Sequence, residues 1–285
     1  MDAIKITHYK DEFLSFYHHA SQHSFNENDR FSAWKKHYGF NPYMKEDPKE
    51  QLAREMLEQA FPKYERALPT IESFLVDEEE IFQYISLIRE SLNAFEPMQL
   101  SIVFFIGDFE TDPFIEKESN DAYTLYFPIE IEWKPILLVN ELAKTVYLNQ
   151  TKLNPRSLND VAHVVYLEGL ALHTADWVTP KDYLSLNIYP WLSKCSREPT
   201  RIMMNLLPHL RRSDYKAVYS FTKGTGASGY TNEASFVGWR TIKHLLEKGH
   251  SLASLLTIPE EQILKIVEQT LYQVMEEAKY IRSNE

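Results

Sequence analysis

Two apolar segments near the middle of the chain constrain its fold more than any other feature. The first, residues 132–150, is apolar on almost every side, and the second, residues 157–177, is rich in valine, leucine and alanine. A helix that is apolar all round belongs in a protein core, because it has no polar face to turn toward water. We therefore expect both segments to form core helices.

Polar side chains interrupt both segments. Asn140 and Glu141 lie four and three residues before Lys144, so the three share one face of the first helix. Glu168 stands among apolar residues in the second helix, beside the small Gly169, where another backbone could approach closely. A buried charge is costly unless it is paired. The simplest interpretation is a structural ion pair of Lys144 with Glu141 or Glu168, and the alternative is a present or former active site.

The same residues resemble the signature of a bacterial family of predicted zinc-dependent proteases. That family carries H-E-x-x-H on an apolar helix and E-G-L-A on the next one, and here the corresponding runs read NELAK and EGLA. The resemblance implies a gluzincin-like core in which Glu141 holds the position of the general base and Glu168 that of the third zinc ligand. Asn140 and Lys144 stand where the family has its two histidine ligands.

This departure from the family pattern changes the chemistry that the site can perform. Zinc needs three or four nitrogen, sulfur or oxygen ligands, and a protonated Lys144 offers no lone pair. Its ammonium would instead take the place of the metal, between Glu141 and Glu168. Without zinc there is neither an activated water nor a Lewis acid. We therefore expect a pseudo-peptidase with no cofactor, in which Glu141 is vestigial and which binds a peptide or protein without cleaving it.

Two other functions stay open. An active hydrolase could keep Glu141 as the base and hold zinc with Glu168 and either His163 or His173. Each histidine lies five residues from Glu168, so it points about 140° away from it on the helix. Alternatively, the chain is a structural or regulatory helical protein in which the polar residues only fix the packing.

A glycine-rich run precedes a predicted helix in the last quarter of the chain. Residues 224–229 read GTGASG, but no series of parallel strands is predicted around them, so we expect a loop rather than a dinucleotide site. Gly229-Tyr230 and Gly238-Trp239 resemble a Gly-Tyr element and a Gly-aromatic helix of the protease family. The resemblance makes Tyr230 a candidate oxyanion donor, although the spacing between the two elements departs from the family.

The rest of the pattern predicts an α+β fold that is mainly helical. β-Branched and aromatic residues at 99–106 and 121–129 predict two strands, joined by an acidic loop at 107–120. The zincin resemblance implies that this small sheet lies beside the motif helix. Prolines are expected to separate three helices in the N-terminal third, near residues 49–61, 63–75 and 77–95.

No linker or repeat separates the chain into parts, so we expect a single zincin-like domain. The domain would comprise N-terminal helices (1–97), the sheet with the motif helices (98–177), and a C-terminal helical part (178–285).

Charge and cysteine content narrow the expected partners and compartment. The net charge of −11 and the lack of a dense Lys/Arg run argue against a nucleic-acid or membrane partner. Cys195 is the only cysteine, which fits a reducing cytoplasm, and the first residues lack the apolar core of a signal peptide. We therefore expect a cytoplasmic protein, with an oligomeric state that the sequence does not indicate.

Overall fold

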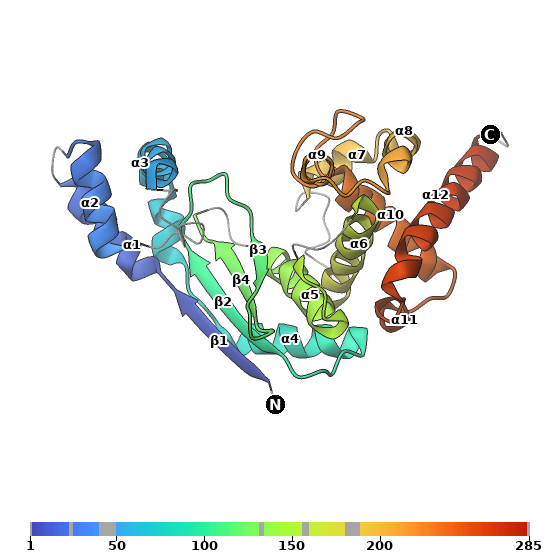
Figure 1. Ribbon diagram of the computed structural model, residues 1–285, viewed down its shortest axis with the longest axis horizontal. Coiled ribbons are helices and arrows are strands. Elements are labelled where there is room, and N and C mark those ends of the chain that lie inside the picture. The colour runs from blue at the N-terminus through green and yellow to red at the C-terminus, as the bar shows by residue number, and fades with distance from the viewer. Residues whose placement is uncertain are drawn as a thin grey trace. The chain divides into compact units, whose positions relative to one another are not determined.

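The protein has an α+β fold that is mainly helical, as the sequence predicts (Figure 1). The computed structural model describes residues 2–22, 25–39, 50–130, 134–155, 160–179 and 189–283. The chain divides into two compact units: unit 1 is Met1–Glu80 with Pro97–Lys134, and unit 2 is Ile81–Glu96 with Pro135–Glu285. The stretch from 97 to 134 thus groups with the N-terminal helices rather than with the motif helices. That the whole chain is one domain stays a prediction.

Unit 1 starts with a strand that is followed by three helices. β1 (Ala3–His8) leads into α1 (Lys10–Ser21), α2 (Glu27–His37) and α3 (Glu50–Ser73). The α2 helix is capped by Asn26, whose side chain accepts hydrogen bonds from the backbone N–H groups of Asn28 and Asp29.

The α3 helix corrects one expectation from the sequence. We expected Pro62 to separate two helices near residues 49–61 and 63–75, but both Pro62 and Pro69 lie inside a single continuous helix. A proline in a helix removes one backbone hydrogen bond, and here a buried stripe along the whole helix offsets that loss. The stripe consists of Ala53, Leu57, Ala60, Tyr64, Ala67 and Ile71.

The four strands of unit 1 form one mixed sheet in the order β1–β2–β4–β3 (Figure 1). β2 (Gln99–Phe105) and β4 (Tyr123–Pro128) are the two predicted strands, and β1, β2 and β4 run parallel. β3 (Phe114–Lys117) is antiparallel to β4 and lies in the stretch expected to be a loop. The sheet belongs to unit 1 and the motif helices to unit 2, so their expected adjacency stays a prediction.

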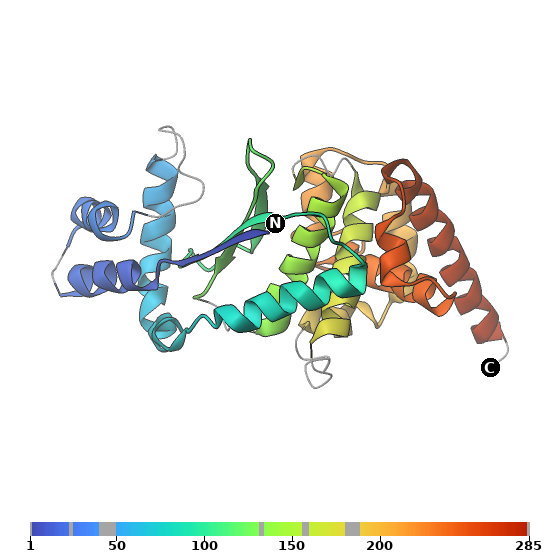
Figure 2. The same cartoon turned by 90° about the horizontal axis from the view of Figure 1, so that it is seen from below.

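Unit 2 is helical throughout its described part. The helix α6 (Val161–Val178) contacts α5 (Pro135–Thr151), α10 (Glu233–Glu247) and α12 (Glu260–Ser283), the last of which is red in Figures 1 and 2. The other helices are α4 (Glu78–Leu92, which lies mostly in this unit), α7 (Pro190–Cys195), α8 (Pro199–Leu206), the 3₁₀ turn η4 (Leu207–His209), α9 (Tyr215–Thr222) and α11 (Leu252–Leu256). Of the helices described in either unit, none combines the length and apolar character that a membrane span requires.

Two glycines bring α6 and α10 into backbone contact. A Cβ atom on Gly169 would lie 2.2 Å from the carbonyl oxygen of Gly238, and one on Gly238 would lie 2.1 Å from that of Val165. Any larger residue at either position would force the helices apart. The close approach expected at Gly169 is therefore confirmed, and it explains the glycines of both EGLA and VGW.

Candidate functional site

The side chain of Lys144 lies between two carboxylates, each from a different helix. Its Nζ is 2.9 Å from Oε1 of Glu141 on α5 and 2.7 Å from Oε1 of Glu168 on α6. The three side chains are 12%, 13% and 18% exposed, respectively. Together with Asn140, whose Nδ2 donates to Oε1 of Glu141 at 3.3 Å, we call them the Lys144 cluster. The ammonium thus occupies the position expected from the sequence.

Burial and charge act against each other in the Lys144 cluster. Desolvation lowers the pKa of Lys144, but Glu141 and Glu168 raise it more, so the net pKa lies above its ordinary value and the ammonium stays protonated. Burial raises the pKa of Glu141, and Lys144 only partly offsets that rise. With both carboxylates ionised, the two glutamates and the lysine carry one net negative charge.

Helix α10 supplies a further contact to the cluster. The hydroxyl of Ser235 donates a hydrogen bond of 3.0 Å to Oε2 of Glu168. Ser235 lies one turn before Gly238, and Glu168 immediately precedes Gly169, so the close crossing of α6 and α10 brings the two side chains together. Glu168 is thereby held by Lys144 on one oxygen and by Ser235 on the other.

Tyr189 immediately precedes α7 and is linked to the site by charge. Its hydroxyl is buried and has no hydrogen-bond partner among the described residues. Burial raises the pKa of Tyr189, and the charges of Lys144, Glu141 and Glu168 also act on it. The hydroxyl therefore lies in the electric field of the Lys144 cluster.

Tyr230 lies elsewhere in unit 2. Its hydroxyl donates a 3.3 Å hydrogen bond to Oε2 of Glu198 at the start of α8, and its backbone N–H donates to Oε1 of Glu233. None of its hydrogen bonds reaches the Lys144 cluster. An oxyanion role for Tyr230 gains no support from these contacts.

The two histidines of the alternative metal site are engaged elsewhere. Nδ1 of His163 is 2.6 Å from Oδ1 of Asp160, and its Nε2 is 3.1 Å from the carbonyl oxygen of Glu260. Nε2 of His173 is 2.9 Å from the carbonyl oxygen of Trp239. Neither ring is hydrogen-bonded to Glu168, in keeping with the angular separation expected on the helix.

The residues of the Lys144 cluster do not fit a zinc ion. Zinc would need ligand lone pairs at the two positions held by Asn140 and Lys144, and the ammonium of Lys144 is kept protonated by Glu141 and Glu168. Across the described part of the chain, no three His, Cys, Asp or Glu side chains are grouped so that they could hold a metal.

The glycine-rich run closes around a buried carboxyl group rather than presenting an open phosphate loop. We call residues 224–233 the Glu233 loop. Glu233, the first residue of α10, is 0% exposed, and its Oε1 accepts hydrogen bonds from the N–H groups of Ser228 (2.8 Å) and Tyr230 (3.1 Å). A Cβ atom on Gly226 would lie 2.3 Å from the Glu233 carboxyl carbon. At least this glycine is therefore needed to make room for Glu233.

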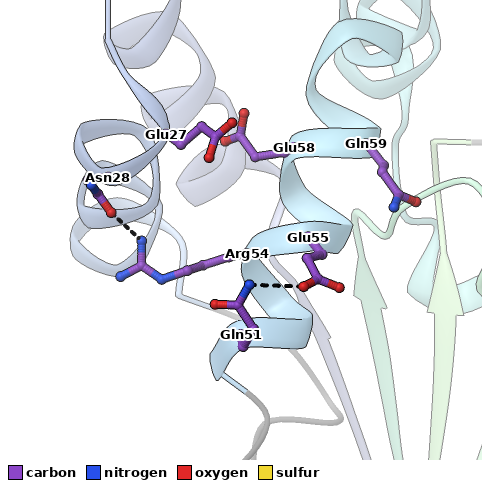
Figure 3. Close-up of a pocket in the computed structure, with 7 residues that line it drawn as sticks. All are labelled: Glu27, Asn28, Gln51, Arg54, Glu55, Glu58 and Gln59. Atoms are coloured by element: carbon purple, nitrogen blue, oxygen red, sulfur yellow. Dashed lines mark hydrogen bonds between the residues drawn. The ribbon is translucent and has the colours of Figure 1, made fainter.

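A surface pocket of about 400 Å³ lies in unit 1, between α2 and α3 (Figure 3). Arg54 reaches across to Asn28 at 3.0 Å, and Gln51 donates to Glu55 at 2.9 Å. Five of the seven lining side chains are exposed, so water can satisfy their polar groups. The pocket is therefore a weaker candidate than the Lys144 cluster. Its lining residues are Glu27, Asn28, Gln51, Arg54, Glu55, Glu58 and Gln59.

Comparisons of the chain with protein-family models, with curated proteins and with solved structures find no match. The resemblance to zinc-dependent proteases therefore rests on the sequence motifs alone.

Proposed function

We propose that this chain is a metal-free relative of zinc-dependent peptidases that binds a peptide or protein without hydrolysing it. The observation that supports the proposal is the position of the Lys144 ammonium, 2.9 Å from Glu141 and 2.7 Å from Glu168. These two carboxylates stand at the base and third-ligand positions of the resembled motif. A lysine cation between them stands in for the cation that such a motif would otherwise bind.

The hydrogen bonds that Glu141 accepts also favour peptide binding over hydrolysis. A general base must be free to accept a proton from a water molecule within hydrogen-bond reach. Here Oε1 of Glu141 already accepts hydrogen bonds from Lys144 and from Asn140. Lys144 supplies a positive charge but no open coordination position for water or for a scissile carbonyl.

The other two functions find less support. An active metal site would need His163 or His173, and both rings are hydrogen-bonded away from Glu168. A purely structural cluster is expected to satisfy its buried polar atoms. Oδ1 of Asn140 is buried and has no partner.

The metal content of the purified protein tests the proposal. The parent and the Asn140→His, Lys144→His double variant are purified without a chelator or a metal-affinity tag and measured by atomic emission. We expect no zinc in the parent and about one zinc ion per chain in the double variant, because the variant restores two His ligands beside Glu168. A triple variant that adds Glu168→Gln is the matched control and should hold less zinc.

Two results would overturn the proposal. Stoichiometric zinc in the parent would show that Lys144 does not replace the metal. Cleavage of a peptide library by the parent that disappears in Glu141→Gln would show that Glu141 is a working base.

A further inference from the structure

Among the described residues of unit 2, four buried oxygen atoms have no hydrogen-bond partner. One is Oε2 of Glu233 in the Glu233 loop, and the other three are Oδ1 of Asn140, the hydroxyl oxygen of Tyr189 and Oδ1 of Asp176. Buried polar atoms in folded proteins nearly always have a partner, because leaving one without a hydrogen bond destabilises the fold. The atoms of Asn140, Tyr189 and Asp176 can all accept a hydrogen bond, and the Tyr189 hydroxyl can also donate one. The protein therefore keeps several unmet acceptors in one part of its fold.

The three acceptors belong to the surroundings of the Lys144 cluster. Of the three, only Asn140 is in direct contact with the cluster: it is 7% exposed and is hydrogen-bonded to Glu141 through its Nδ2. The charges of Lys144 and Asp176 both act on the hydroxyl of Tyr189. Asp176 follows Glu168 by two turns of α6, about 12 Å along the helix, and Tyr189 is within electrostatic reach of both.

The charges around these atoms favour a cationic ligand. Glu141, Glu168 and Asp176 supply three carboxylates, against the ammonium of Lys144 and the more distant charge of Lys223, which also lowers the pKa of Glu141. One net negative charge is left when all five groups are ionised. An anionic ligand would be repelled by this net negative charge, and the ammonium of Lys144 already donates to two carboxylates.

We propose that the Lys144 cluster binds a cationic nitrogen group of its ligand, an ammonium or a guanidinium, through the unmet acceptors of Asn140 and Tyr189. In a peptide this group is the N-terminal amine or the side chain of lysine or arginine. Each of these groups brings a positive charge and several N–H donors, and donors are what the unmet acceptors lack. The inference rests on the proposed peptide binding and adds the chemical class that is recognised.

Four peptides of one neutral sequence, each with a fluorophore at its C-terminus, test this inference by fluorescence polarisation. One has a free N-terminus, one is N-acetylated, and two are N-acetylated with a single internal lysine or arginine. We expect at least one cationic peptide to bind about tenfold or more tightly than the acetylated neutral one, the factor expected for a hydrogen bond to a charged group. The peptide that binds best identifies the source of the cation.

Variants separate recognition from folding. Asn140→Leu and Tyr189→Phe remove unmet acceptors, so we expect each to keep or raise the thermal unfolding temperature of the free protein while it weakens cationic peptide binding about tenfold. Binding of the neutral peptide should weaken less than binding of the cationic peptide. Tyr215→Phe is the matched control, because Tyr215 is 81% exposed on α9, and it should change neither measurement.

The outcomes distinguish this inference from the proposed function. Equal affinity for neutral and cationic peptides would overturn the inference and leave peptide binding in place. A cationic preference that survives in the Asn140→Leu, Tyr189→Phe double variant would also overturn it. Failure of all four peptides to bind would count against both the inference and the proposed peptide binding.

Discussion

Unit 2 buries carboxyl groups in two places and compensates them in different ways. In the Lys144 cluster, Glu141 and Glu168 share the ammonium of Lys144, which is held within 2.9 Å of both. In the Glu233 loop, the carboxyl of Glu233 is hydrogen-bonded by backbone N–H groups, and its Oε2 is buried without a partner among the described residues. One site is stabilised by a side-chain cation and the other by the dipoles of a loop.

This difference decides how each site responds to change. A carboxyl group held by backbone dipoles can take up a proton and become neutral, and burial already raises the pKa of Glu233. A carboxylate pair that shares one ammonium depends on that ammonium, because the alternative is an uncompensated buried charge. Loss of one partner should therefore lower the free energy of unfolding far more in the Lys144 cluster than in the Glu233 loop.

The largest expected effect is that of Lys144→Met. This change leaves Glu141 and Glu168 close together without a cation and should lower the free energy of unfolding by about 3–5 kcal/mol. Urea unfolding measures it. Adding Glu141→Gln and Glu168→Leu should restore most of the stability.

Lys63→Met is the matched control for this comparison. Lys63 pairs with Glu110 at 3.5 Å on the surface of unit 1, where the side chains are 45% and 79% exposed. Loss of this pair should lower the free energy of unfolding by less than about 1 kcal/mol. A Lys144→Met protein as stable as Lys63→Met would show that the cluster does not depend on its ammonium.

The same substitution at the two sites should give unequal effects. At pH 7, Glu141→Gln replaces a charge-assisted hydrogen bond to Lys144 by a weaker neutral one and should lower the free energy of unfolding by about 1–2 kcal/mol. Glu233→Gln keeps an oxygen that accepts from the N–H groups of Ser228 and Tyr230. It should therefore change the free energy of unfolding by less than about 1 kcal/mol. Denaturant unfolding of both variants, side by side, measures the contrast. The reverse order would mean that Glu233 is held as an anion.

A smaller effect is expected in the pH dependence of stability. The pKa of Glu233 is raised from 4.5 in the folded state, chiefly by burial. Its contribution to stability is therefore fully present below pH 4.5 and is lost as the pH rises through the folded-state pKa. Glu233→Gln removes this contribution, so the stability of the variant relative to the parent should increase as the pH rises from 4.5. Unfolding curves from pH 4.5 to about pH 8 measure the difference, and parallel profiles would contradict it.

The smallest effect is expected at Tyr230. Its hydroxyl makes one long hydrogen bond to Glu198, so Tyr230→Phe should lower the free energy of unfolding by about 0.5 kcal/mol or less. It should also leave peptide binding unchanged, in contrast to Tyr189→Phe. A loss of binding in Tyr230→Phe that equals the loss in Tyr189→Phe would move the recognition site toward the Glu233 loop.

Local patterns in the sequence predicted the core helices and a pair of Lys144 with Glu141 or Glu168, because helical spacing places residues on one face and buried charges must find partners. That Lys144 would lie between both carboxylates was inferred with the help of the family resemblance. The small Gly169 likewise indicated a close helix neighbour, although not which helix would supply it.

Contacts between distant segments could not be predicted in this way. The charges of the cluster act on Tyr189 only through the folding of unit 2, and Tyr189 lies in no recognisable motif. Glu233 follows a glycine-rich run at the start of a helix, which is where an acidic residue is ordinarily found. That position alone did not reveal that the loop would enclose its side chain. The continuous α3 shows that a buried stripe can override prolines, which local rules treat as breaks.

The position of β1 at the edge of the sheet has a consequence for the order of folding. β1 pairs in parallel with β2, from Ala3 with Gln99 to His8 with Phe104, so the first strand has no strand partner until the chain has been made past α4. During synthesis the helices α1 to α3 can form while β1 still has an open edge, and sheets closed by such distant pairings form slowly. A ribosome that pauses before β2 would thus hold a chain whose first strand is free to pair with another molecule.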